Sequence, residues 1–171
     1  GDTLQVMAYM GEAVVKDCAL DLFKGLYKVN AFTWKDGQLA YDDNFAARTA
    51  GLDYGHLSLS GVNIAVDSLS YCAPDLSLLL RECSFREKCG LHVTHLSGPV
   101  LMDSLRLRLP SLTLRTTESS LDARLDMALN TFDSQAPGVM ELFADGSFGK
   151  QDLLHFMGGM PPAFLRQWPN Y

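Results

Sequence analysis

The side chains best suited to chemistry are two histidines and a group of aspartates. His92 and His95 stand three residues apart in the segment LHVTH, and Asp42, Asp43 and Asp53 fall in one polar stretch. Closely placed histidines can bind a metal ion, and paired carboxylates can act as general acid and base. Positions three apart on a strand point to opposite faces, so we do not expect the two histidines to hold one ion together.

Neither group reaches the pattern of a known catalytic site. The aspartates lie in DDNFAARTAGLDYG (42–55), whose composition is typical of a solvated loop, and His56 is expected to be a surface or partly packed residue. The segment GSFGK (146–150) lacks the spacing of a phosphate loop, and the sequence has no G-x-S-x-G motif. We predict no enzymatic activity, no catalytic residue and no cofactor. A site built from Asp42, Asp43 and His56 stays open as an alternative.

Length and composition bound the class of protein. The 171 residues, 47% of them hydrophobic and 20% charged, suffice for one globular domain with a core. A net charge of −6 argues against nucleic-acid binding, which needs a basic patch. We expect no membrane-spanning helix, because no run of about 18 apolar residues occurs. The chain opens on Gly1 rather than Met, so we expect it to be a fragment of a longer protein.

Four cysteines do not make a disulfide framework at this length. Cys83 and Cys89 flank SFREK and could face each other across a hairpin, although the simpler interpretation is four free, mostly buried thiols. No C-x-x-C pair occurs, so we predict no metal site.

Alternation with period two recurs along the middle of the chain. In HLSLSGVNIAVDSLSY (56–71) the apolar phase changes twice, and a Gly or a polar pair marks each change, as at bulges and turns. Similar patterns fill 75–85, 90–109 and 119–132. Five or more strands at such close spacing predict a meandering antiparallel sheet.

The two ends of the chain are less regular. We expect a strand in 3–15, a short helical turn in 19–25 that Gly25 caps, and a strand in 27–42. The segment 139–149 again looks like a strand, and 150–168 is expected to be helical, covering part of the sheet.

The segment SLRLRLPSLTLRT (104–116) predicts a strand with one apolar and one charged face. Burying a leucine is worth about 1.5–3 kcal/mol, so the apolar face needs a cover: a second sheet, a helix, or a ligand with hydrocarbon chains. Nine residues are expected to form this face: Leu105, Leu107, Leu109, Leu112, Leu114, Leu121, Leu125, Met127 and Leu129.

The stretches GLDYGHLSLSGVNIAVDSLSY (51–71) and LSLLLRECSFREKCGLHVTHLSGPVLMDSLRLRLPSLTLRTTESSLDARLDMAL (76–129) resemble the periplasmic region of AsmA/TamB-type proteins, especially the TamB-like proteins of Bacteroidetes. The segments 2–39 and 149–169 are also similar to units of that family. The resemblance therefore spans nearly the whole chain, and its motifs are structural patterns rather than catalytic signatures.

This resemblance implies a fold and a function. Family members are anchored in the inner membrane by an N-terminal helix and extend through the periplasm, where their strands curl into a taco-shaped trough with an apolar inner surface. They take part in outer-membrane biogenesis, through phospholipid transport between the membranes or, with an outer-membrane barrel partner, through translocation and assembly of surface proteins. The nine apolar residues would then contact lipid chains or an apolar client strand.

We therefore predict a mainly β protein, a curved antiparallel sheet shaped as a trough or half-barrel. The single domain, 1–171, would comprise a strand-turn-strand unit (1–41), the sheet (56–149) and the helical segment (150–168) packed on it. The alternative is a compact β-sandwich that acts as a protein-interaction module with no lipid role.

Overall fold

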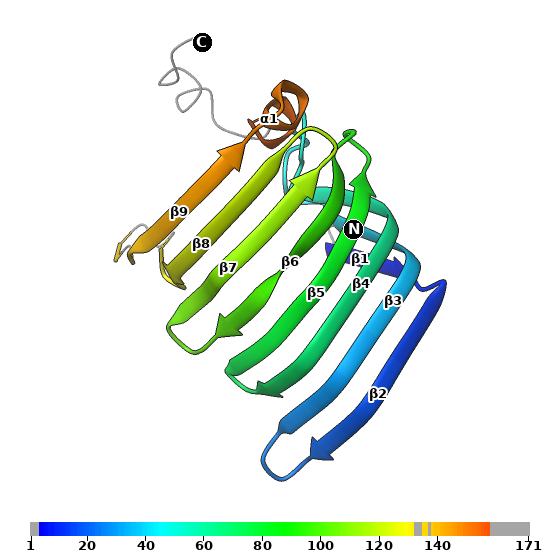
Figure 1. The fold of residues 1–171 in the computed structure, drawn as a ribbon, viewed down its shortest axis with the longest axis vertical. Helices are drawn as coiled ribbons and strands as arrows, with labels where there is room; N and C mark the ends of the chain where they lie inside the picture. Colours follow the sequence, from blue (N-terminus) through cyan, green and yellow to red (C-terminus); the bar gives the residue numbers. More distant parts are fainter. Residues whose placement is uncertain (1–3, 132–134, 137, 158–171) are drawn as a thin grey trace.

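The computed structural model describes residues 4–131, 135–136 and 138–157. The chain forms one sheet and a short helix in this part (Figure 1). The elements are β1 (Leu4–Tyr9), β2 (Glu12–Asp21), β3 (Leu26–Asp43), β4 (His56–Cys72), β5 (Asp75–Glu87), β6 (His92–Met102), β7 (Arg106–Thr116), β8 (Ser120–Ala128), β9 (Met140–Ser147) and α1 (Lys150–Met157).

The sheet is an antiparallel meander, as its sequence pattern predicts. From β3 to β9 each strand pairs with the next along the chain, while β1 and β2 both pair with β3, one after the other along its length. The sheet is curved and does not close into a barrel (Figure 1). All nine strands of the described residues belong to it, so the second layer of the sandwich alternative is not found there.

Bulges keep the apolar side chains of each strand on one face. The pairing of β4 shifts around Gly61 (φ 57°) and Ser68 (φ 52°), the two places where its apolar phase changes. Each extra residue restores the alternation and bends the strand. Leu59, Ile64 and Leu69, which come from three different phases, consequently lie on the same face of the sheet.

Gly98 gives a test of how closely these strands approach. It has φ 147° in β6, and a Cβ at this position would overlap the carbonyl oxygen of Ser111 on β7. Gly98→Ala is expected to lower the free energy of unfolding by roughly 1–3 kcal/mol, because the strained backbone and the overlap both act. Urea denaturation measures the loss.

Gly25→Ala is the matched control for Gly98→Ala. Gly25 also has a positive φ, 61°, but nothing lies within 4 Å of an added Cβ. Gly25→Ala is therefore expected to lower the free energy of unfolding only by the cost of the positive φ, about 1–2 kcal/mol. If both variants lose the same stability, the close approach of β6 and β7 at Gly98 has no energetic importance.

Two local expectations at the N-terminal end are wrong. The helical turn expected in 19–25 is instead the end of β2 and a hairpin turn, closed by N–H groups of Phe23 and Lys24 that donate to the Asp21 carboxylate at 3.2 and 3.1 Å. The single strand expected in 3–15 is two strands separated near Gly11. In both places pairing with β3 outweighs the local pattern.

Three of the six buried hydrophobic side chains of the described residues gather at one end of the sheet. Leu52, Leu91 and Val93 form a small core there, and Phe156 of α1 packs against it. We call the loop 44–55, the turn 88–91 and α1 together the end cap. Backbone hydrogen bonding joins its parts, since the N–H of Leu52 donates to the carbonyl of His155 at 2.8 Å.

Helix α1 is fixed to the sheet by polar contacts at its beginning. The buried carboxylate of Asp152 accepts hydrogen bonds from the hydroxyls of Thr116 and Ser119, the latter at 2.6 Å. The predicted packing of a C-terminal helix on the sheet is confirmed for 150–157, and the rest of the expected helical segment lies outside the described residues. No helix in the part that the structure describes is long and apolar enough to cross a membrane.

Candidate functional site: an apolar trough

The candidate site begins with the leucines of β7 and β8. These strands pair antiparallel, so residues in register share a face. A bulge after Leu109 takes up the change of phase at Pro110, and the alternation resumes at Leu112. Four apolar pairs result: Leu107 with Met127, Leu109 with Leu125, Leu112 with Ala123, and Leu114 with Leu121.

Seven of the nine residues expected on the apolar face lie on it. Leu105 and Leu129 differ, because β7 begins at Arg106 and β8 ends at Ala128. Both leucines fall beyond the strand ends, where they are 71% and 47% exposed. The backbone joins them, as the N–H of Leu129 donates to the carbonyl of Leu105 at 2.8 Å.

The same face continues across the whole sheet, well beyond the residues predicted for the site. On β9, Met140 and Leu142 pair with Met127 and Leu125, and their alternation in MELFADGS was a usable sequence signal. Other strands add further apolar residues in register: Val15 and Leu20 on β2, Tyr27, Phe32 and Trp34 on β3, Ile64 and Val66 on β4, Leu78, Leu80 and Phe85 on β5, and Leu96 and Val100 on β6.

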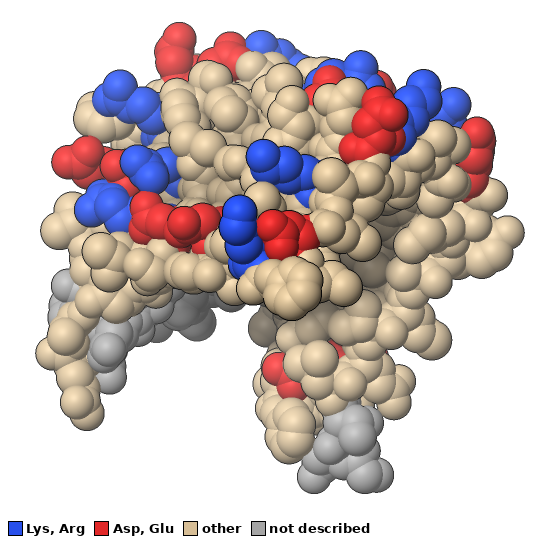
Figure 2. All heavy atoms as spheres, turned by 90° about the horizontal axis from the view of Figure 1, so that it is seen from below, with Lys and Arg blue, Asp and Glu red and all other residues tan. Residues whose placement is uncertain are grey.

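The opposite face of the sheet carries the charged side chains. Arg–Asp pairs bridge neighbouring strands at short distances: Arg106 to Asp126 at 2.6 Å, Arg115 to Asp122 at 3.0 Å, and Arg81 to Asp67 at 2.7 Å. In Figure 2 most Lys, Arg, Asp and Glu residues gather on the outside of the arch, and the hollow beneath them is lined mainly by other residues, with a few acidic ones on one leg. The sheet is therefore a trough with an apolar inside.

The inside of the trough is largely uncovered. Only six hydrophobic side chains of the described residues are buried, and three of them form the core at the end cap. The leucines of β7 and β8 are half-buried, and Met140 and Leu142 are 47% and 58% exposed. Soluble monomers seldom expose apolar patches above a few hundred Å². An inner face of this extent therefore indicates a binding surface.

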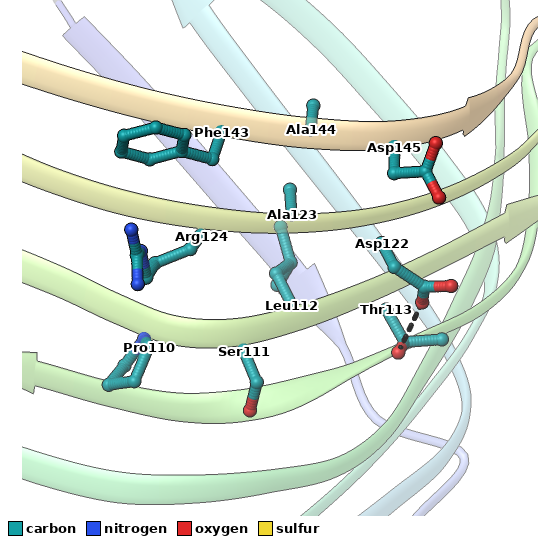
Figure 3. A pocket seen from close by; sticks show the side chains of 10 residues that line it. All are labelled: Pro110, Ser111, Leu112, Thr113, Asp122, Ala123, Arg124, Phe143, Ala144 and Asp145. Carbon is teal, nitrogen blue, oxygen red and sulfur yellow. Dashed lines mark hydrogen bonds between the residues drawn. The ribbon is translucent and has the colours of Figure 1, made fainter.

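A shallow depression of about 640 Å³ lies over β7, β8 and β9 (Figure 3). Thr113 donates to Asp122 at 2.8 Å, and the guanidinium of Arg124 stands 4.6 Å from the centre of the Phe143 ring. Arg115 and Thr113 hold the pKa of Asp122 below its ordinary value. These contacts hold the side chains of Thr113, Asp122 and Arg124 in place.

His56 is buried, contrary to the expectation of a surface or partly packed residue. Its Nδ1 lies 3.0 Å from the Asp53 carboxylate and its Nε2 lies 3.5 Å from Asp42. Asp53 is also buried, contrary to the expected solvated loop, and it accepts the N–H groups of Thr49 and Gly55. This arrangement closes the loop 44–55 on itself. No nucleophile is hydrogen-bonded to His56 among the contacts of the described residues, and the histidine acts as a structural link.

Asp53 predicts a pH dependence of stability. The N–H of Thr49 and the ring of His56 hold the pKa of Asp53 below its ordinary value, despite burial. Because the folded pKa is depressed, the stabilisation is fully present above about pH 5. It begins to be lost as the pH falls through the unfolded value of about 3.9, and it is gone only below the depressed folded pKa. Urea midpoints between pH 6 and pH 3 should fall more steeply for the wild type than for Asp53→Asn. Equal slopes would contradict this role.

His92 and His95 lie on the same, outer face, contrary to the prediction. Val93 pairs with Thr116 and His95 with Arg115, so one extra residue, Thr94, forms a bulge between them. The two histidines do not gain a third ligand, since the described residues contain no group of three or more His, Cys, Asp or Glu placed to hold a metal ion. The four cysteines are free thiols; Cys18 is exposed and the other three are partly buried, which differs from the expected mostly buried set.

The comparisons with known proteins identify no relative for this trough. No family model, no curated protein and no solved structure matches the chain. Function must therefore be argued from the trough itself.

Proposed function

We propose that the inner face of the trough binds lipid hydrocarbon chains, and that the chain works as a non-enzymatic segment of an AsmA/TamB-like envelope protein in the periplasm. Its role there would be in outer-membrane biogenesis, through phospholipid transport between the membranes. The observation that carries the proposal is the exposed inner face, apolar in register from β2 to β9 beneath a charged exterior.

The chemistry of this face favours hydrocarbon over a polar ligand. Aliphatic side chains make no directional hydrogen bonds, so the face gains free energy from any apolar surface in proportion to the area covered. A polar ligand would lose its hydration there without new partners. The Arg–Asp pairs keep the outer face in water.

A photo-crosslinker tests the proposal at the level of single residues. Incorporated at Leu107, which faces the trough, the crosslinker is expected to yield phospholipid adducts in cells that make the full-length protein. Incorporated at the neighbouring Arg108, whose side chain pairs with Asp103 on the outside, it is expected to yield none. Mass spectrometry of the purified protein detects the adducts. Absence of adducts at Leu107, or equal adducts at both positions, would refute lipid binding in the trough.

A second candidate occupant is an apolar strand of a client protein, assembled with an outer-membrane barrel partner. The observation that favours it is the edge strand β9, all eight residues of which are exposed, with only β8 beside it in the described sheet. Such an edge can accept an added strand. In the crosslinking experiment this candidate predicts protein adducts at Leu142 on β9 and no lipid adducts at Leu107.

A further inference from the structure

Four strand connections meet at the end of the sheet opposite the end cap (Figure 1). They are the turns β2–β3, β4–β5 and β6–β7 and the connection after β8. Three of them present apolar side chains outward: the turns β2–β3 and β6–β7, and the connection after β8, where Leu129 and Val139 are exposed. Leu22 and Phe23 at the tip of β2–β3 are 76% and 105% exposed, and Leu105 at β6–β7 is 71% exposed beside Leu129. Phe23 therefore makes almost no contact with the rest of the chain.

An aromatic pair lies directly behind the first of these tips. Tyr27 on β3 and Tyr71 on β4 are in register, with ring centroids 6.1 Å apart, and both are partly exposed. Tyrosine has an apolar ring and a polar hydroxyl, and this combination is enriched where protein meets the membrane–water boundary. Tyr27 lies on the same face of the sheet as Phe32, and this face lines the trough.

Two of these turns each contain an ion pair between opposite charges. Lys24 lies 3.7 Å from Asp21 in the β2–β3 turn, and Arg108 lies 2.9 Å from Asp103 in the β6–β7 turn. No basic cluster is formed by these groups to attract anionic lipids. The exposed surface is therefore suited to a bilayer without net charge, bound through apolar insertion.

We propose that this end of the sheet docks on a lipid bilayer, with Leu22, Phe23 and Leu105 entering the region between the headgroups and the acyl chains. The inference rests on the proposed function, because it supplies the entrance through which a lipid passes from the membrane to the trough. The end cap exposes Phe45 and Leu154, but neither residue belongs to the strands whose inner face forms the trough.

Vesicle flotation tests the docking. The full chain is mixed with phosphatidylcholine vesicles and centrifuged, and the bound fraction is measured. The wild type is expected to float with the vesicles, in 0.1 M and in 0.5 M NaCl alike. Leu22→Ser/Phe23→Ser is expected to lower the vesicle affinity at least tenfold, while the control Phe45→Ser/Leu154→Ser keeps the wild-type affinity. All four positions are exposed, so both variants should fold.

A wild type that does not float, or a control variant that loses as much affinity as the tip variant, would overturn the docking. Titration with a monomeric fluorescent fatty acid, without vesicles, separates this failure from that of the proposed function. If the wild type binds the fatty acid but not the vesicles, the proposed function of the trough stands and only the docking proposal is refuted. If the wild type binds neither the fatty acid nor the vesicles, both the proposed function and the docking proposal are refuted. Under the docking proposal the tip variant binds the monomeric fatty acid as the wild type does.

Discussion

Replacing Leu112 and Leu125 together by aspartate is expected to lower the affinity for a fluorescent long-chain fatty acid at least tenfold. Both side chains line the trough, on β7 and β8. An acyl chain packed there would have to dehydrate two carboxylates that gain no partner, at a cost of several kcal/mol. Each 1.4 kcal/mol corresponds to a tenfold change in affinity. Fluorescence titration of the purified variants measures the loss.

Ser111→Asp/Arg124→Asp provides the matched control for this variant. Both residues are exposed and lie on the same two strands. The substitution likewise adds two acidic groups, and it also removes the positive charge of Arg124. If lipid chains lie in the trough, this control binds the fatty acid with wild-type affinity. Circular dichroism establishes that both variants keep their β structure. Equal affinity in the two variants would mean that the inner face is not where the hydrocarbon binds.

The second prediction with a large expected effect is a loss of stability when the core of the end cap is truncated. Leu91 is 2% exposed in the turn between β5 and β6, and it is the central residue of the small core with Leu52 and Val93. Leu91→Ala is expected to lower the free energy of unfolding by about 2–5 kcal/mol, the usual cost of a large-to-small change in a core. The midpoint of urea denaturation reports it.

Leu105→Ala makes the same chemical change at an exposed position. Leu105 is 71% exposed, and its truncation is expected to alter stability by no more than about 0.5 kcal/mol. A comparable loss in both variants would show that the end cap is not the part of the molecule that holds the sheet in shape.

Much of the fold is predictable because one physical rule governs it. Side chains alternate along a strand, so the apolar positions of 56–71 and 104–116 locate strands and their inner faces. The breaks in alternation are also informative, since a chain that must keep one face apolar needs a bulge wherever the phase changes. Gly61, Ser68 and Pro110 fall at those points.

The features of the fold that the sequence did not predict depend on contacts between segments that are distant along the chain. The sequence of 19–25 is compatible with a helical turn, and only the pairing of β2 with β3 extends the strand to Asp21. His56 and Asp53 look like loop residues until the loop folds over them and leaves each buried. No Gly marks the bulge at Thr94, which places His92 and His95 on one face. The apolar phase does change there, from Val93 to Leu96, and this was the sequence signal that the prediction for the two histidines did not use.

Nuclear magnetic resonance with a spin-labelled fatty acid would test lipid binding in the trough most directly. The sheet carries leucines on both faces: Leu107, Leu109 and Leu125 line the trough, whereas Leu79 and Leu101 lie on the outside. With leucine methyl groups labelled, the account predicts that the spin label broadens the inner signals and leaves the two outer ones unchanged. Equal broadening of both sets, or none in the inner set, would contradict it.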